Sequence, residues 1–337
     1  MNDFCNLKSN RRWWPYALVV FAASLCAHVP IGLAHDKPVK PSGGDADAAL
    51  AKKIGYYIDC INDHSNDVFK TRAMYFSWMK DPKHGPTGRE RFVYGLYTLD
   101  DSKDCRAGIA RAASLLPAEP KVEHSAAKWI AALDELEPVA AEAHSYYDLK
   151  DYKDDDMRKG KALHPQLMKA FARFEAANDD LYAQVVAVRD GLDQRRLQRL
   201  AADPTRHATY LLAVLSDEAK RISRLTDRVG SKNFDQQAYS TTVQAYEKAY
   251  FAVDTYRKQH PDDKRQAFGG LLVMGPAMDL LKSAKALGRR ARDGFRYGAG
   301  DRMFIEAGNG ELVEGHPKQV IDKYNTFISA MNTWGQR

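Results

Sequence analysis

Apolar side chains recur at alternating steps of four and three residues along most of this chain. The first run begins at Leu50, Ile54, Tyr57 and Ile61 and continues to Met79. This spacing places the side chains on one stripe of an α-helix, which is buried only when helices pack together. Similar runs begin at Trp129, Leu167, Leu212, Tyr239, Phe268 and Val320. The pattern therefore predicts an all-α fold, an elongated antiparallel bundle of about seven helices.

Two long connections interrupt this pattern, at residues 81–104 and 294–316, whereas most other connections are short. The second holds Asn309-Gly310 between two short apolar segments, Met303-Phe304-Ile305 and Leu312-Val313. Asn-Gly favours the tight turn that joins two twisted strands. We therefore expect a small β-hairpin insertion near residues 303–314. Long ordered loops often carry function, although they also cover the ends of bundles.

The N-terminus has the pattern of a bacterial secretory signal. Arg11 and Arg12 precede an apolar run from Trp13 to about Ala34, and Gly32 and Ala34 are small residues at the expected cleavage positions. A basic segment followed by such a run directs export. We interpret residues 1–34 as a signal peptide cleaved after Ala34, residues 35–47 as a flexible tether, and residues 48–337 as a single helical-bundle domain.

Two other interpretations of this segment place the protein on a membrane. The apolar run is long enough to span a bilayer if it stays uncleaved, although His28 and Pro30 weaken that interpretation. Cys26 is a candidate for lipidation, but Leu25 occupies a position where a small residue is required. The expected location is periplasmic or secreted, with membrane anchoring as the alternative.

Composition narrows the classes of partner. The chain has 337 residues and a net charge of +6, which falls to +4 if residues 1–34 are removed. This mild basicity, in an exported chain, does not predict binding to nucleic acid.

The cysteine count falls from four to two with the same cleavage, leaving Cys60 and Cys105. In an oxidising compartment such a pair predicts a disulfide, and two buried free thiols are the alternative.

One group of polar residues suggests a metal site. His144, Asp148, Asp151 and Asp155 are spaced by four, three and four residues, and His164 follows. They would share one helical face if a single helix ran from Ser125 to Gly160. Imidazole and carboxylate groups bind divalent cations such as zinc or calcium. The alternative is a solvated acidic face neutralised by nearby lysines, and no HExxH, CxxC or EF-hand motif supports a metal. We predict no other cofactor.

Three separated segments, in this order, resemble the YiiG-like family of bacterial envelope proteins, a domain of unknown function often described as lipoproteins. They are residues 57–62 (YIDCIN), residues 85–88 and 94–97 (GPTG and YGLY), and residues 146–164, which include Tyr146-Tyr147, DYKDD and KGKALH. The resemblance covers most of residues 48–337. It implies an envelope location and a helical fold, and it implies no activity. Leu25-Cys26 departs from the lipoprotein pattern.

These observations favour an exported envelope protein that binds or organises a partner. Neither a G-x-S-x-G motif nor a phosphate-binding loop is present, so we favour a role without catalysis, without excluding an enzyme. The expected partner is another envelope protein, an anionic lipid surface or the cell-wall polymer. A metal-binding or hydrolytic protein with a site around residues 144–164 is the alternative.

Overall fold

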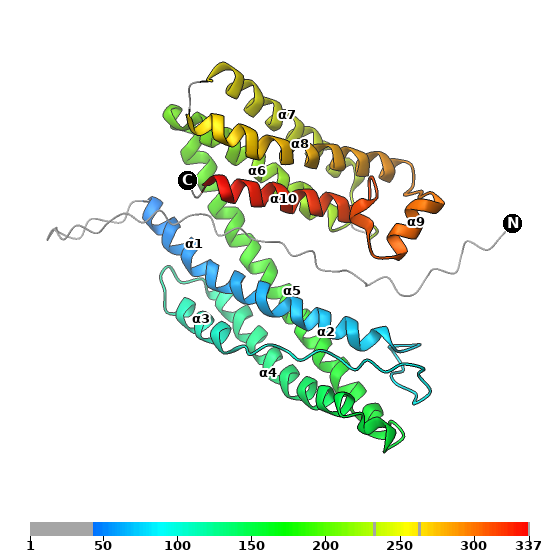
Figure 1. The fold of residues 1–337 in the computed structure, drawn as a ribbon. Coiled ribbons are helices and arrows are strands. Elements are labelled where there is room, and N and C mark those ends of the chain that lie inside the picture. Colours follow the sequence, from blue (N-terminus) through cyan, green and yellow to red (C-terminus); the bar gives the residue numbers. More distant parts are fainter. Residues whose placement is uncertain (1–42, 232–233, 262–263, 336–337) are drawn as a thin grey trace. The chain divides into compact units, whose positions relative to one another are not determined.

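The computed structural model describes residues 43–231, 234–261 and 264–335, which form two compact units (Figure 1). The boundary falls within one helix, between Leu192 and Asp193. The single domain predicted over residues 48–337 spans both units and stays a prediction. The signal peptide, the anchoring alternatives at Trp13–Ala34 and Cys26, and residues 35–42 of the tether lie outside the described residues.

Unit 1 is built from helices α1 to α5 and a long non-helical connection. Its elements are α1 (Gly43–Cys60), the π-helical turn η1 (Ile61–Ser65), α2 (Asn66–Ser77), α3 (Lys103–Ala113), α4 (Pro120–Asp148), the 3-10 turn η2 (Asp151–Lys153) and most of α5 (Arg158–Ala201). Because α1 begins at Gly43, the last residues predicted as tether are helical. The non-helical residues 78–102 between α2 and α3 are called the strap below.

The core of unit 1 follows the predicted stripes. Tyr57 and Tyr75 from the α1–α2 run, Trp129 from α4 and Phe174 from α5 are fully buried. One amide joins these helices, because the Oδ1 atom of Asn178 on α5 accepts hydrogen bonds from Ser65 and from Trp129 Nε1. A buried polar atom is tolerated only when it is paired in this way.

Lys53 is a fully buried cation that contacts the turn between α3 and α4. Its ammonium group donates to the carbonyl oxygens of Leu115 (2.9 Å) and Pro117 (3.0 Å) and lies 2.5 Å from the carboxylate of Glu123. The same carboxylate accepts the backbone N–H of Glu119, at the start of α4. Lys53 therefore fastens α1 to the turn that joins α3 and α4.

Unit 2 contains the end of α5 and four longer elements packed side by side. They are α6 (His207–Thr226), α7 (Gln236–Gln259), α8 (Lys264–Arg292) and α10 (Pro317–Gly335), with η3 (Pro204–Arg206), the short helix α9 (Ala299–Glu306) and η4 (Gly310–Leu312) between them. α8 runs antiparallel to both α7 and α10 (Figure 1). The buried hydroxyl groups of Tyr239 and Tyr246 on α7 donate to carbonyl oxygens of α8, at Ala284 and Ala277.

The all-α prediction is confirmed for the described residues, but two details are wrong. About seven helices is too few, because the described residues contain helices α1 to α10. The hairpin near residues 303–314 is absent there, and α9 and η4 occupy that segment. The hairpin turn that Asn-Gly favours needs a positive φ at Asn309, where φ is −95°. No helix among the described residues is long and apolar enough to cross a bilayer.

Candidate functional site

The strap is an extended segment of unit 1 that contacts helices of this unit along its length. Just after α2, the indole Nε1 of Trp78 donates to the carbonyl oxygen of Gly95 (2.9 Å). On α2 itself, the hydroxyl group of Thr71 donates to the carbonyl oxygen of Tyr97 (3.3 Å). Between them Leu96 is buried, with 4% of its surface exposed. These contacts hold residues 95–97 against the helix that precedes them in sequence.

α4 holds the same stretch of the strap from another side. The Nδ1 atom of His144 donates to the carbonyl oxygen of Leu96 (2.9 Å), which leaves Nε2 to accept the hydroxyl group of Thr98 (3.2 Å). Gly95 has a φ of +67°, and a Cβ atom there would lie 2.8 Å from Cβ of Tyr147. Only glycine combines this backbone conformation with so close an approach.

The first turn of the strap covers His164 on α5. Gly85 has a φ of +79°, and a Cβ atom there would lie 2.5 Å from the imidazole ring. The Nδ1 atom of His164 shares a hydrogen bond with the hydroxyl group of Tyr75 (3.1 Å). Burial lowers the pKa of His164, and the adjacent backbone of Lys83 and Pro82 offsets part of that effect. This histidine is therefore buried beneath the strap, in an environment that favours its neutral form.

Glu90 closes a tight turn in the middle of the strap. Its carboxylate accepts the backbone N–H groups of Thr87 (2.6 Å) and Gly88 (2.8 Å) and the hydroxyl group of Thr87 (2.7 Å). Burial alone would raise the pKa of Glu90, but these hydrogen bonds outweigh it and hold the pKa below its usual range. The carboxylate is therefore occupied within the turn.

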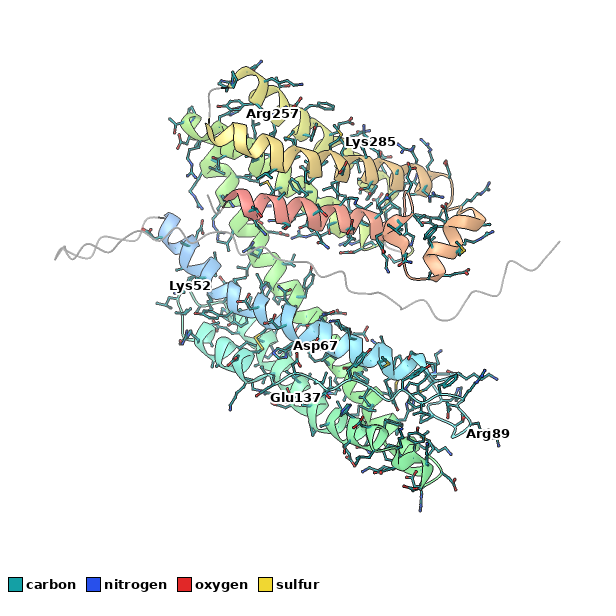
Figure 2. The ribbon with its side chains drawn as sticks, viewed as in Figure 1. Lys52, Asp67, Arg89, Glu137, Arg257 and Lys285 are labelled. Carbon is teal, nitrogen blue, oxygen red and sulfur yellow. A yellow bond between two sulfur atoms is a disulfide. The ribbon has the colours of Figure 1, made fainter. Side chains whose placement is uncertain are left out.

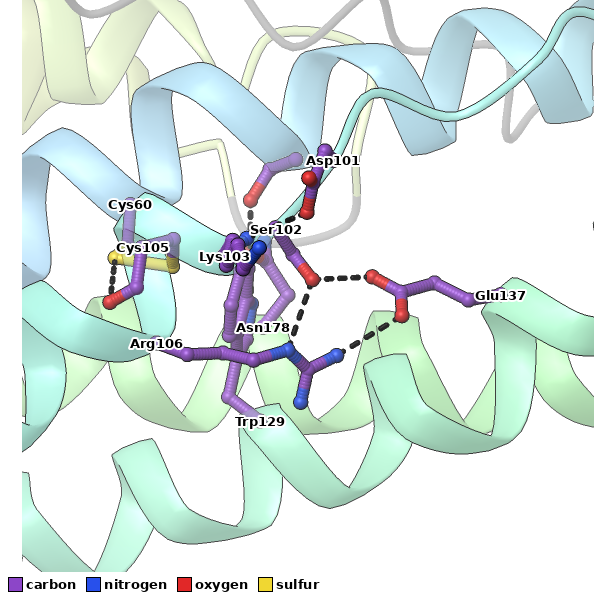
Figure 3. The surroundings of a disulfide bond; sticks show 10 residues. Cys60, Asp101, Ser102, Lys103, Cys105, Arg106, Trp129, Glu137 and Asn178 are labelled. Carbon is purple, nitrogen blue, oxygen red and sulfur yellow. Dashed lines mark hydrogen bonds and ion pairs between the residues drawn. A yellow bond between two sulfur atoms is a disulfide. The ribbon is translucent and has the colours of Figure 1, made fainter.

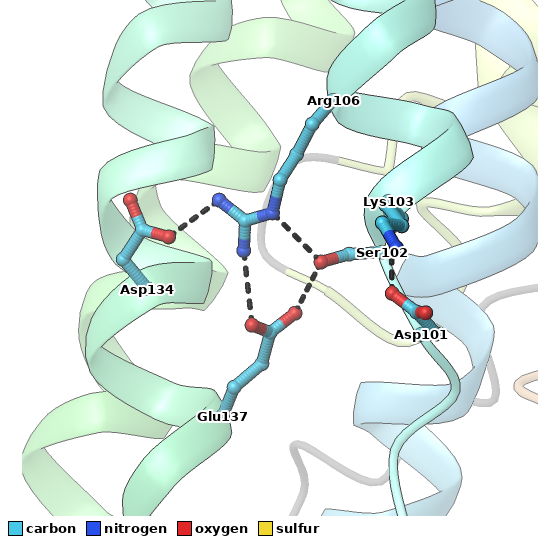
Figure 4. Close-up of polar contacts among 6 residues, drawn as sticks. All are labelled: Asp101, Ser102, Lys103, Arg106, Asp134 and Glu137. Carbon is cyan, nitrogen blue, oxygen red and sulfur yellow. Dashed lines mark hydrogen bonds and ion pairs between the residues drawn. The ribbon is translucent and has the colours of Figure 1, made fainter.

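The far end of the strap is anchored beside the disulfide. Ser102 donates to Glu137 on α4 (2.5 Å) and accepts from Nε of Arg106 (2.9 Å), and Arg106 also pairs with Glu137 and Asp134 (Figure 4). Close to this network, Cys105 on α3 is bonded to Cys60 on α1 (Figure 3). The predicted disulfide is confirmed.

With its backbone fixed, the strap presents three aromatic rings to solvent. Phe92, Tyr94 and Tyr97 are 57%, 62% and 51% exposed. The rings of Phe92 and Tyr94 are nearly parallel, at an angle of 6° and with centroids 6.2 Å apart. The guanidinium group of Arg91 lies over Phe92, 5.2 Å from its centroid. We call Arg89, Arg91, Phe92, Tyr94 and Tyr97 the strap surface.

The predicted metal ligands do not gather at one point. α4 ends at Asp148, and Lys150 adopts a left-handed conformation (φ 63°), so Asp151 and Asp155 do not continue the face of His144. The assumption of one helix from Ser125 to Gly160 is wrong. Asp148 and Asp151 are exposed. Among the described residues, no three His, Cys, Asp or Glu side chains come close enough to hold a metal.

Asp155, another of these residues, has a structural role. Its carboxylate accepts the hydroxyl group of Tyr146 (2.8 Å) and the backbone N–H groups of Arg158 (3.1 Å) and Lys159 (2.8 Å), at the start of α5. These hydrogen bonds outweigh the effect of burial and keep its pKa below the usual range. The metal or hydrolytic site around residues 144–164 thus stays a prediction that the described geometry does not support.

Comparison with known proteins assigns the chain to a family. Residues 48–333 match the family model described as "Protein of unknown function (DUF3829)". The chain belongs to this family. It is also similar to the uncharacterized protein YiiG of Escherichia coli (strain K12), with 27% identity over 309 residues, covering 90% of this chain and 85% of that protein. The YiiG-like resemblance is confirmed. No solved structure matches the chain.

In this family member, the two histidines predicted as metal ligands lie beside the strap. His144 and His164 lie on α4 and α5, and each contacts the strap. The sequence did not predict a function for the strap surface. The available signal was the placement of Phe92, Tyr94 and Tyr97 in a glycine- and proline-containing connection, outside any apolar helical stripe.

Proposed function

We propose that this chain is an exported envelope protein that binds its partner through the strap surface. The observation that carries the proposal is the exposure of three aromatic side chains on a backbone fixed by α2, α4 and α5. Large exposed apolar groups gathered on one segment mark interaction sites. Because the strap is already ordered, binding costs little conformational entropy.

Two features support an envelope location. The sequence of residues 1–34 has the basic and apolar segments of an export signal, and the Cys60–Cys105 disulfide is typical of an oxidising compartment. The mass of the chain recovered from an expressing bacterium tests this location. Cleavage after Ala34 gives a chain that begins at His35, lipidation gives one that begins at a modified Cys26, and an uncleaved anchor leaves residue 1 in place. Recovery of the full chain from the cytosol, with reduced cysteines, would contradict export.

Sedimentation with washed bacterial envelopes tests the binding role. We expect the wild-type chain to sediment with the envelopes and the triple variant Phe92→Ser/Tyr94→Ser/Tyr97→Ser to lose most of this binding. The matched control is Phe251→Ser, which alters a 49% exposed aromatic side chain of unit 2. Circular dichroism should show equal helix content in all three proteins. Equal binding by the wild type and the triple variant would remove the strap surface as the contact site.

A further inference from the structure

The strap surface carries positive charge that the fold does not neutralise. Arg89 and Arg91 are both exposed, and among the described residues no acidic side chain forms an ion pair with either guanidinium group. Glu90, which lies between them in sequence, directs its carboxylate into the turn at Thr87 and Gly88. Figure 2 shows Arg89 at the outer edge of unit 1, on the strap. Two cations therefore accompany the exposed rings.

Two exposed cations on the helices of unit 1 differ in this respect. Lys159 pairs with Glu142 (2.9 Å) and Arg173 pairs with Glu135 (2.6 Å), each across the α4–α5 pair. Lys80 and Lys83 add two more exposed basic groups on the strap. The exposed carboxylates of the strap are Asp81, which is held by His84 (2.7 Å), and Asp100 and Asp101, which lie at its far end before α3. Over the whole strap four basic and four acidic side chains balance, but residues 80–91 hold four basic side chains against Asp81 and Glu90. This part of the strap therefore carries the basic excess available to an anionic partner.

Aromatic rings beside basic groups suit the surface of a phospholipid bilayer. Tyrosine and other aromatic side chains settle at the level of the headgroups, where one end of the ring is apolar and the other is wet. Basic side chains beside them are attracted by anionic headgroups. A peptide or glycan strand is usually held in a groove. Two grooves among the described residues, one between α8 and α10 and one beside the disulfide, are lined by residues outside the strap.

We propose that the strap surface docks on anionic phospholipid headgroups. In this arrangement Arg89 and Arg91 contact phosphate groups, and the rings of Phe92 and Tyr94 enter the headgroup layer. This inference rests on the proposed function, since it names the partner of the same surface. Binding should require anionic lipid and should weaken as salt is added, because salt screens exposed charges.

Sedimentation with vesicles tests the proposal on the full chain. The probes are vesicles of phosphatidylcholine alone and vesicles of equal parts phosphatidylcholine and phosphatidylglycerol. We expect binding to the anionic vesicles to fall roughly 25-fold in Arg89→Gln/Arg91→Gln, from about fivefold for each basic residue. The control Lys169→Gln/Lys282→Gln removes two exposed lysines elsewhere, with the same change in net charge, and should change binding less than twofold. All variants keep the same N-terminal residues, so any contribution of Trp13–Ala34 cancels.

The outcomes separate this inference from the proposed function. Equal losses in the arginine variant and its lysine control would show a general charge effect and would overturn lipid docking by the strap. Loss of binding to purified cell-wall sacculi or to washed envelopes, with vesicle binding unchanged, would also overturn lipid docking while keeping the strap surface as the binding site. If strap variants bind vesicles, sacculi and envelopes like the wild type, both proposals fail.

Discussion

His144 donates a hydrogen bond from Nδ1 to the carbonyl oxygen of Leu96, 2.9 Å away, and so joins α4 to the middle of the strap. The two residues are 48 positions apart. Leu96 is buried, so its carbonyl group has little access to water as an alternative partner. The bond therefore matters to both the stability of unit 1 and the order of the strap surface.

Replacing His144 by alanine should loosen the strap. A buried carbonyl group left without its donor costs about 1–3 kcal/mol, so we expect urea unfolding to show a loss of about that size. Hydrogen exchange at residues 94–98 should become faster. The control is His84→Ala, which removes an 82% exposed imidazole from the same strap and should change stability little, because its pair with Asp81 is a surface pair. Unchanged exchange in His144→Ala would contradict this role.

Gly85 is a second residue at which the strap packs closely against a helix, here against His164 on α5. Gly85→Ala places a methyl group against the ring of His164 and also strains a backbone with φ near +79°. The strain costs about 1–2 kcal/mol, and the crowding adds about 1–3 kcal/mol. Gly308→Ala is the matched control, because φ there is +85° and no heavy atom lies within 4 Å of the added carbon. Unfolding curves should show the larger loss at Gly85, and equal losses would contradict the contact.

The Cys60–Cys105 disulfide should contribute to stability through the loop that it closes. The cysteines are 45 residues apart, and chain entropy assigns a loop of this length about 4 kcal/mol. We expect Cys60→Ser/Cys105→Ser to lower the free energy of unfolding by about that amount. Reductant should destabilise the wild type similarly and leave the variant unchanged. A variant as stable as the oxidised wild type would show that the bond closes no stabilising loop.

The helical stripes were predictable because burial depends on local spacing. Leu167, Phe174 and Leu181 are buried on α5 as their steps of seven predict, and Tyr239 and Tyr246 are buried on α7 in the same way. The cysteine pair could be predicted from compartment and count alone. These inferences need no knowledge of which helices become neighbours.

The strap and its supports depend on contacts that sequence spacing does not encode. The partner of His144 is a main-chain oxygen of a distant segment, and backbone atoms have no sequence signature. The assumption of one helix through Asp151 was wrong at Lys150, whose left-handed conformation ends the expected helical face. The hairpin prediction was wrong at Asn309, whose φ is negative. Single backbone angles of non-glycine residues decided both outcomes.

The buried carboxyl group of Asp227 makes the stability of the folded chain depend on pH. Burial raises the pKa of this carboxyl group, which follows α6, from 3.8 to about 6. The folded chain therefore holds its proton more tightly than the unfolded chain. The contribution of Asp227 to stability is most favourable below about pH 4, falls as the pH rises through about 6, and then stays level.

Asp227→Asn should remove this dependence, because the amide remains neutral at every pH. We expect the variant to be more stable than the wild type by roughly 2 kcal/mol at pH 8, since each unit of pKa corresponds to about 1.4 kcal/mol and the side chain keeps some access to water. At pH 4 the two proteins should differ little. Urea unfolding at the two pH values measures the difference, with Asp235→Asn as a control for an exposed aspartate near the same turn. A stability gain of equal size at pH 4 and pH 8 would show that the carboxyl group is not the source.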